Sequence, residues 1–191
     1  LSAEHGVKRF IFASSAAVYG GHEPGEKGLK EDLPPLPLSP YGISKHAAEE
    51  YVKAYASLCG MNYIIFRYPN VYGPRQKSGD GGVIVIFTQH MTNGEDVTIF
   101  GNGHQTRDFL FVKDAARANV TALEAGNGTL NIGTGSATSI NDLFSMLKEK
   151  MKYQKNALYA PERKGEVKHS KLDCTKAKSE LWWTAETNLQ D

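Results

Sequence analysis

The sequence predicts an α/β fold built on a parallel sheet. Short apolar segments that suit buried strands, at 8–13, 62–67 and 130–132, alternate with longer segments whose apolar residues recur at helical spacing, at 40–59 and 140–152. Strands that alternate with helices form parallel sheets, because each helix carries the chain back along the sheet. At 191 residues the chain is long enough to bury a core as one domain.

The first strand is expected from His5 to about Ser14, followed by a loop rich in Gly, Pro and charged residues. The prolines of the segment 33–37 hold that loop extended. Ser39-Pro40 supplies the cap and the first turn of a long helix, which Gly60 ends. The packing stripe of this helix is expected to consist of Ala47, Ala48, Tyr51, Val52, Tyr55 and Ala56.

The second part of the chain continues the alternation. Its expected elements are a helix at 83–93, a strand at 97–100, a strand at 105–112, a helix at 114–124, a strand at 130–132 and a helix at 140–152. Gly94 follows the first of these helices and Ser139 precedes the last, and these are the positions that glycine and serine favour at helix ends. Periodicity does not resolve the tail at 159–183.

Composition excludes several function classes. The chain has 22 basic and 21 acidic residues, so no overall field attracts nucleic acid or an anionic membrane. Its longest apolar run, Val83 to Phe87, is too short to cross a bilayer. Cys59 and Cys174 lack C-x-x-C spacing, which fits the cytoplasm, and the scattered histidines suggest no metal site.

The segment from Ser39 to Lys45 places Tyr41 and Lys45 four residues apart at the start of a helix. At that spacing both side chains leave the same face, one turn apart. An ammonium close to a phenol favours the phenolate and so lowers the pKa of the tyrosine, which makes the pair a candidate general acid/base. Taken alone, the pattern also fits a solvated helix start with a surface aromatic residue and a surface cation.

Two further polar blocks follow strands. Ser14 and Ser15 come after the first strand, and Tyr68-Pro69-Asn70-Val71-Tyr72-Gly73-Pro74-Arg75 comes after the second. The carboxyl ends of parallel strands are where open α/β sheets bind ligands. We therefore expect these blocks and Tyr41 to share one site.

Together the three blocks resemble the extended short-chain dehydrogenase/reductases, and within them the UDP-galactose (UDP-glucose) 4-epimerase group of the NAD-dependent epimerase/dehydratase family. The resemblance covers nearly the whole chain in the family's order. It implies a Rossmann-type parallel sheet, formed by 1–72 and 108–135, and a smaller α/β substrate-binding lobe, formed by 73–107 and 136–191. It also implies NAD as cofactor, a UDP-sugar substrate and a homodimer of the full-length protein.

The family begins with a glycine-rich turn that cradles the cofactor pyrophosphate, and no G-x-G-x-x-G occurs here. The nearest match is at Gly133 and Gly135, but Thr138 stands where the third glycine belongs, so a turn before the helix at Ser139 is the better interpretation. The chain also starts at Leu1 and stops at what resembles the beginning of a helix. We expect a fragment cut at both ends that lacks the N-terminal glycine-rich half and is inactive in isolation.

The resemblance also assigns roles near the reacting centre. It makes Tyr41 the base that removes the C4 hydroxyl proton, with Lys45 lowering its pKa and binding the nicotinamide ribose. Ser15 bonds the reacting hydroxyl. Ser14, Tyr68 and Pro69 are implied cofactor contacts.

Further residues are implied to bind the substrate. Asn70 holds sugar or phosphate oxygens, Arg107 and Arg163 hold the UDP phosphates, and Glu166 bonds the uridine ribose. Val83 and Phe87 either line the uracil pocket or belong to the core. Ser170 stands where epimerases restricted to unsubstituted hexoses carry a bulky Tyr, so its small side chain leaves room for an N-acetyl group.

Other activities on the same scaffold stay open. Sugar-nucleotide dehydratases carry an Asp-Glu pair where this chain has Ala16 and Ala17, and alanine cannot transfer a proton, so dehydration is disfavoured. A nucleotide-sugar decarboxylase or reductase uses the same Ser, Tyr and Lys. A fragment without catalytic competence is the remaining alternative.

Overall fold

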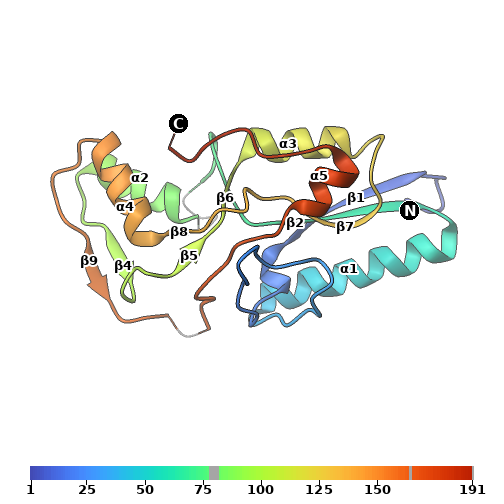
Figure 1. Cartoon of the computed structure of the whole chain (residues 1–191), viewed down its shortest axis with the longest axis horizontal. Coiled ribbons are helices and arrows are strands. Elements are labelled where there is room, and N and C mark those ends of the chain that lie inside the picture. The colour runs from blue at the N-terminus through green and yellow to red at the C-terminus, as the bar shows by residue number, and fades with distance from the viewer. Residues whose placement is uncertain (78–81, 164, 191) are drawn as a thin grey trace.

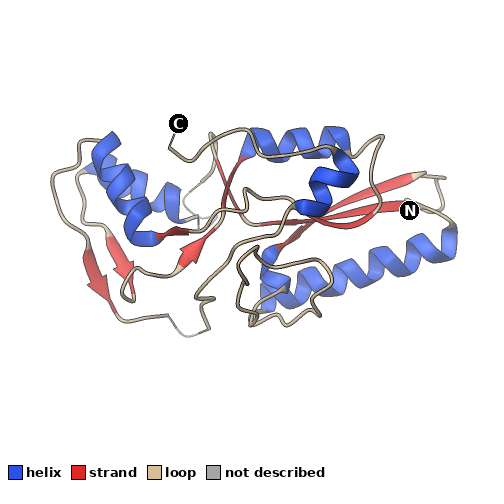
Figure 2. Ribbon diagram, in the orientation of Figure 1, coloured by secondary structure: helices blue, strands red, loops and turns tan. Residues whose placement is uncertain are grey.

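The computed structural model describes residues 1–77, 82–163 and 165–190. Helices and strands alternate along these residues, and the main sheet is parallel, which confirms the predicted α/β fold (Figure 1). The molecule is elongated. The main sheet with α1, α3 and α5 occupies one end, and α2, α4 and four short strands occupy the other (Figure 2).

The main sheet has three parallel strands in the order β1-β2-β7. Their bounds are Arg9–Ser15 for β1, Asn62–Tyr68 for β2 and Gly128–Asn131 for β7. The first strand begins later than expected, because Gly6 has a φ of 64° in a hydrogen-bonded turn and breaks the extended chain. The register pairs Ser15 with Tyr68, so the polar blocks that follow β1 and β2 start side by side.

Helices cover both faces of this sheet. Helix α1 (Pro40–Cys59) lies on one face, and α3 (Val112–Thr121) and α5 (Thr175–Leu181) lie on the other (Figure 2). A core cluster joins the sheet to α3 and α5, and full burial of one large apolar side chain contributes about 1.5–3 kcal/mol. Its largest buried members are Ile64, Phe66, Leu110, Leu130, Ile132, Leu181 and Trp183.

The predicted ends of α1 are confirmed. The Ser39 hydroxyl accepts a hydrogen bond from the Gly42 backbone N–H at 3.1 Å, and Pro40 occupies the first turn. At the other end Gly60 adopts a φ of 64°, the left-handed conformation that glycine takes at helix ends without strain.

The predicted packing stripe of α1 is wrong in part. Tyr51 and Tyr55 are 69% and 56% exposed, whereas the buried positions are Gly42, Glu49 and Ala56. The helix therefore turns Glu49 toward the sheet and the two tyrosines away from it. The reason is that Ser14 and Arg67 donate hydrogen bonds to Glu49, and the periodicity of the helix does not report such distant partners.

The other end of the molecule contains α2 and α4 packed together around a second apolar cluster. Helix α2 spans Val83–Asn93 and ends at Gly94, as predicted. Helix α4 begins at Ile140 behind a Ser139 cap, as predicted, but ends at Lys150, two residues before the expected end. The strands here are β4 (Thr98–Phe100), β9 (Leu158–Ala160), β5 (Thr106–Arg107) and β8 (Thr138–Ser139).

The prediction of one strand over 105–112 is wrong. The chain forms β5, leaves the extended ladder at Asp108, and then forms β6 (Phe109–Phe111), which pairs in parallel with β3 (Asn70–Tyr72). Strand β5 instead pairs antiparallel with β8. The break has a physical cause: the buried Asp108 carboxylate accepts hydrogen bonds from the Thr134 and Gly135 backbone, which holds this point of the chain against the turn after β7. Helix α3 accordingly begins at Val112 rather than Asp114.

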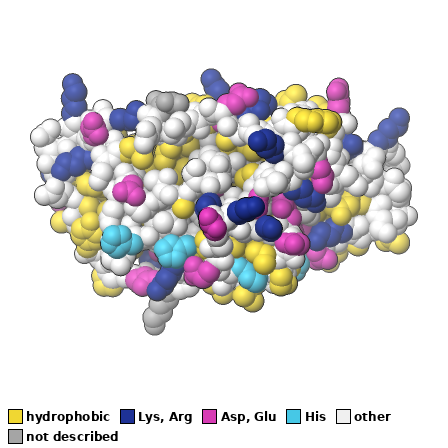
Figure 3. All heavy atoms as spheres, viewed as in Figure 1, with side chains coloured by type: hydrophobic (Ala, Val, Ile, Leu, Met, Phe, Trp, Pro, Cys, Tyr) yellow, Lys and Arg dark blue, Asp and Glu magenta, His cyan; other side chains and the backbone are white. Residues whose placement is uncertain are grey.

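The tail that periodicity left open contains β9 and α5, separated by a long connection. Acidic and basic side chains are interspersed on the face that Figure 3 shows, in keeping with the near-balanced charge. Within the three described stretches, no helix combines the length and hydropathy needed to cross a lipid bilayer.

Candidate active site

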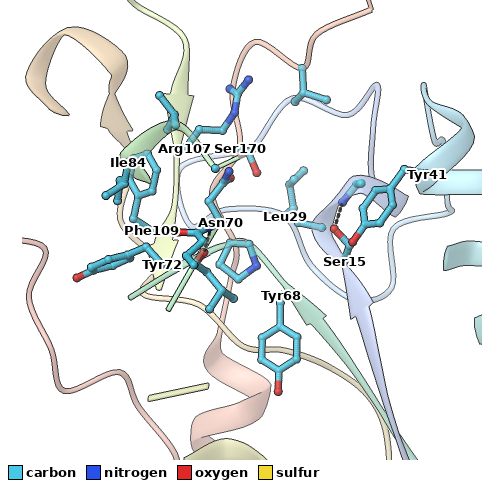
Figure 4. Close-up of a pocket in the computed structure, with 18 of the residues that line it drawn as sticks. Ser15, Leu29, Tyr41, Tyr68, Asn70, Tyr72, Ile84, Arg107, Phe109 and Ser170 are labelled. Carbon is cyan, nitrogen blue, oxygen red and sulfur yellow. Dashed lines mark hydrogen bonds between the residues drawn. The ribbon is translucent and has the colours of Figure 1, made fainter. Parts of the chain in front are cut away.

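A pocket of about 510 Å³ lies at the carboxyl ends of β1 and β2, between the main sheet and the other end of the molecule. The strand ends supply Ser15, Tyr68, Pro69 and Asn70 to its wall, and the start of α1 supplies Tyr41. Val83, Arg107 and Ser170 complete the set of predicted site residues that line it. In Figure 4, Ser15 and Tyr41 lie on one side, across from Arg107, Ser170 and Phe109.

Ser15 is held in place by its own turn. It is the last residue of β1 and the N-cap of a short 3-10 helix (Ala16–Val18), and its hydroxyl accepts a hydrogen bond from the Ala17 backbone N–H at 3.2 Å (Figure 4). A serine hydroxyl has two lone pairs and one O–H. The Ser15 O–H therefore remains able to donate to a ligand in the pocket.

Tyr41 and Lys45 occupy successive turns of α1, as their spacing predicts. The Lys45 ammonium donates to the Ala13 carbonyl at 2.9 Å and lies 5.8 Å from the centroid of the Tyr41 ring. This bond anchors the lysine to β1 two residues before Ser15. Tyr41 is 55% exposed and faces the pocket.

Gly42 lets α1 approach the segment after Ser15 closely. A Cβ at this position would lie 2.6 Å from the Ala17 carbonyl oxygen. Such overpacking costs about 1–3 kcal/mol, while replacing a helical glycine by alanine gains about 1 kcal/mol. We expect Gly42→Ala to lower the free energy of unfolding by about 1 kcal/mol in urea titrations.

The matched control for that variant is Ser57→Ala, at an exposed position of the same helix, which is expected to be neutral or slightly stabilising. A Gly42→Ala protein as stable as the wild type would show that α1 can shift away from Ala17 without loss.

Tyr68 forms the floor of the pocket below Asn70 (Figure 4). Its hydroxyl accepts a hydrogen bond from the Asn119 side-chain amide at 2.6 Å. Burial raises the pKa of Tyr68 well above its ordinary value, and the Asn119 bond opposes this only in part. Tyr68 is therefore a neutral wall residue rather than an acid/base group.

Arg107 dominates the opposite wall. One of its terminal nitrogens donates to the Glu166 carboxylate at 2.8 Å, and the other donates to the Thr106 carbonyl at 2.8 Å. Burial lowers the pKa of Arg107, and the neighbouring Glu166 carboxylate partly restores it. The guanidinium remains the positive group on this side of the pocket, opposite Ser15 and Tyr41.

Lys45 and the remaining predicted residues lie outside the pocket wall. The Ser14 hydroxyl points away and donates to the Glu49 carboxylate at 2.5 Å. The Arg163 guanidinium stacks 3.8 Å above the Phe100 ring. Glu166 lines a neighbouring cavity of about 340 Å³ and reaches the main pocket only through Arg107. Phe87 is buried in the second core cluster. A core position was one of the two roles expected for it, the other being the lining of a uracil pocket.

Sequence reasoning missed several pocket residues. Tyr72 lies in the block after β2 but received no role there, and Gln76 directly follows that block, so the strand end was a usable signal for both. Phe109 follows Arg107 by two residues, so the strand predicted over 105–112 would have placed both on one face, although the structure breaks that strand at Asp108. Leu29 and Val167 come from connections without periodicity, so the sequence carried no signal for them.

These features define an α/β protein with a polar ligand pocket at the carboxyl ends of parallel strands. The model of the NAD dependent epimerase/dehydratase family matches residues 1–133. The chain therefore belongs to the NAD dependent epimerase/dehydratase family.

Relatives and solved structures agree with this assignment. The chain is 46% identical over 190 residues to a Methanocaldococcus jannaschii protein provisionally named a UDP-glucose 4-epimerase, covering 98% of this chain and 61% of that protein. A crystal structure of the Thermotoga maritima UDP-glucose 4-epimerase with UDP-glucose matches with a TM-score of 0.95 and 45% identity, over 99% of this chain and 62% of that one. The Thermus thermophilus UDP-glucose 4-epimerase in complex with NAD matches with a TM-score of 0.90 and 32% identity, over 99% and 62%. The chain thus spans about three fifths of the length of these proteins.

Proposed function

We propose that the full-length protein containing this chain is an NAD-dependent isomerase that epimerises the C4 position of a UDP-hexose. The observation that carries this proposal is the pocket itself, which places Ser15 and Tyr41 opposite the Arg107 guanidinium within one cavity of about 510 Å³. A hydroxyl pair at one side suits a sugar alcohol, and a guanidinium at the other suits a diphosphate.

The residues present fit the nicotinamide end of NAD. Tyr41, Tyr68 and Pro69 line the pocket, and the Lys45 ammonium, which carries three N–H donors, uses one for Ala13 and has others for a ribose. Ser14 is a further proposed contact. When bound, NAD accepts and returns the hydride of C4. The glycine-rich cradle for its pyrophosphate is not part of these 191 residues, so we expect the isolated chain to be inactive.

In the proposed reaction Tyr41 accepts the proton of the C4 hydroxyl as that carbon becomes a ketone. It returns the proton when the alcohol forms again on the other face of the sugar. Ser15 donates a hydrogen bond to the same oxygen and so orients it toward Tyr41. Lys45 provides the positive charge beside the ring of Tyr41.

The substrate's remaining groups have proposed partners around the pocket. Asn70 bonds sugar or phosphate oxygens, Arg107 and Arg163 hold the diphosphate, and Glu166 bonds the uridine ribose. Val83 contacts the uracil base, and Phe87 packs behind Val83 in the second core cluster. Ser170 lines the pocket with a small side chain, which leaves room for an N-acetyl group.

Ala16 and Ala17 favour epimerisation over dehydration. Both line the pocket beside Ser15, and neither has a group that can transfer a proton. The Asp-Glu pair that dehydratases use for loss of water is therefore absent at these two positions.

The proposal is tested on the full-length protein with UDP-galactose, UDP-N-acetylgalactosamine and UDP-glucuronate, followed by NMR. We expect either galacto-sugar to become its gluco epimer. Release of carbon dioxide from UDP-glucuronate would replace the proposal by a decarboxylase, and a folded, NAD-bound protein that forms no epimer would contradict it.

We further propose a division into a cofactor domain (1–72 and 108–135) and a substrate lobe (73–107 and 136–191). Two separate apolar clusters support it, one around the main sheet and one between α2 and α4.

We also propose a cytoplasmic homodimer. The free thiols of Cys59 and Cys174 support the compartment, and the exposed tyrosines of α1 support the dimer. Sedimentation of the full-length protein tests the dimer.

A further inference from the structure

A buried carboxylate, Glu49, links α1, β1 and β2, the three elements whose ends line the pocket. Its side chain is 0% exposed, and its two oxygens accept hydrogen bonds from Arg67 Nε at 3.0 Å and from an Arg67 terminal nitrogen at 2.7 Å. The Ser14 hydroxyl donates to the same carboxylate at 2.5 Å. Among the ion pairs of the described residues, this is the one in which both side chains are almost fully buried.

Each anchor of this network adjoins a pocket residue. Ser14 precedes Ser15 at the end of β1, and Arg67 precedes Tyr68 at the end of β2. Glu49 follows Lys45 by one helical turn and Tyr41 by two, so the three residues lie along one side of α1. The carboxylate thereby ties α1, β1 and β2 together immediately behind the pocket.

The network continues to a further residue of the pocket lining, Leu29. The Arg67 guanidinium lies 4.7 Å from the centroid of the Tyr19 ring, and the Tyr19 hydroxyl donates to the Asn131 side chain at 2.7 Å. The Asn131 amide in turn donates to the carbonyl of Leu29, a pocket residue. Burial raises the pKa of Tyr19 to about 12, so this hydroxyl stays protonated and keeps its role as a donor.

Stability alone does not account for such a network. A buried ion pair must overcome the desolvation of both charges, and a well-packed apolar pair of similar volume is often as stable or more stable. A bidentate Arg–carboxylate pair fixes the angle and the distance between the two elements that carry it. An apolar pair does not impose such a geometry. The arrangement therefore favours a function that depends on geometry.

We propose that Glu49 is a positioning residue for the epimerisation, which holds Tyr41 and Lys45 in register with Ser15 through its bonds to Ser14 and Arg67. This inference rests on the proposed function. A displacement of about 1 Å at reacting groups can lower a rate about 100-fold. Loss of the network should therefore appear in kcat and leave the binding of the substrate's distant diphosphate unaffected.

The test replaces the pair as a unit in the full-length protein, by combining Glu49→Leu with Arg67→Met. We expect this variant to fold and to melt somewhat below the wild type, because it buries no unpaired charge but leaves the Ser14 hydroxyl without its acceptor. We expect kcat to fall about 100-fold with KM nearly unchanged. Amide exchange should accelerate in the segments 12–15 and 40–46, where the pocket residues lose their anchor, and stay unchanged in α2 and α4.

The matched control is Glu50→Gln, the neighbouring carboxylate, which is exposed and pairs with Lys53 at 2.7 Å. It should leave kcat, KM and exchange at their wild-type values. A folded double variant with wild-type kcat and wild-type exchange would overturn the proposal and leave the network a purely structural feature.

Should the double variant fail to fold, Glu49→Asp decides. Aspartate keeps a negative charge opposite the buried Arg67 guanidinium but withdraws the carboxylate by one methylene group, so the three bonds to Ser14 and Arg67 cannot all form. We expect a folded protein with reduced kcat and unchanged KM, and a wild-type kcat would overturn the proposal. If the wild type converts no UDP-sugar, the proposed function fails, and the exchange in segments 12–15 and 40–46 alone decides whether Glu49 positions them.

Discussion

Tyr41→Phe in the full-length protein is expected to lower kcat for the C4 epimerisation about a thousandfold, within the range that general acid–base groups contribute. Phenylalanine keeps the ring in the pocket wall and removes only the hydroxyl that accepts and returns the proton. Because Tyr41 is 55% exposed, the free energy of unfolding should change by less than about 0.5 kcal/mol. Steady-state kinetics and urea titrations of the same preparation measure both quantities.

The control for this prediction is Tyr51→Phe, which removes a hydroxyl from the same helix at a position 69% exposed and outside the pocket. It should keep wild-type kcat and KM. If Tyr41→Phe retained wild-type kcat, the proton would have to move through another group, and the Ser15 hydroxyl is the other one available at this side of the pocket.

Local signals were enough to predict the boundaries of α1 and α2 and the start of α4. The Ser39 cap, the proline after it and the left-handed Gly60 define α1, and Gly94 ends α2 at the expected residue. These features depend on a few neighbouring residues whose backbone preferences are strong. Apolar segments that alternate with helices likewise predicted the three strands of the main sheet and their parallel direction, although not their order.

The wrong predictions depend on partners far away in the sequence. Glu49 turns inward because Ser14 and Arg67 donate hydrogen bonds to its carboxylate. These partners lie 35 and 18 residues away in the sequence. Tyr51 and Tyr55 face outward although their apolar character suggested burial. No periodicity within a helix reports on partners of this kind, so the stripe of α1 could not be predicted from its own residues.

The candidate site shows the same division. Ser15, Tyr41 and Asn70 could be placed together, because strand ends and a helix start are local features that a parallel sheet brings to one edge. Sequence could not predict that Arg107 pairs with Glu166 or that Arg163 stacks on Phe100. Both contacts depend on the path of a long connection that has no periodicity.

Asp108→Ala is expected to be the most destabilising single change near the site, at about 3 kcal/mol. The Asp108 carboxylate is 0% exposed and accepts hydrogen bonds from the Thr134 N–H at 3.0 Å, the Thr134 hydroxyl at 2.6 Å and the Gly135 N–H at 3.1 Å. Alanine leaves these donors without an acceptor, and each buried unsatisfied group costs about 1–3 kcal/mol. The turn after β7 and the break between β5 and β6 should loosen together.

The size of this loss should depend on pH in a defined direction. Burial raises the pKa of Asp108, and the hydrogen bonds from Thr134 and Gly135 oppose the shift without cancelling it. A carboxyl whose pKa is higher in the folded than in the unfolded protein contributes its full stability below the unfolded pKa of about 3.9, and loses part of it as the pH rises through the folded pKa. The difference in unfolding free energy between the wild type and Asp108→Ala should therefore be larger at about pH 4 than at about pH 7.

Urea titrations of the full-length protein at both pH values measure this difference. Asp96→Ala serves as the control, because Asp96 is exposed and its ion pair with Lys155 lies at the surface, where solvent screens it. An Asp108→Ala protein that loses less than Asp96→Ala would mean that other acceptors satisfy Thr134 and Gly135. A loss that grows toward pH 7 would mean that the ionised carboxylate is the form the fold prefers, against the direction that its burial imposes.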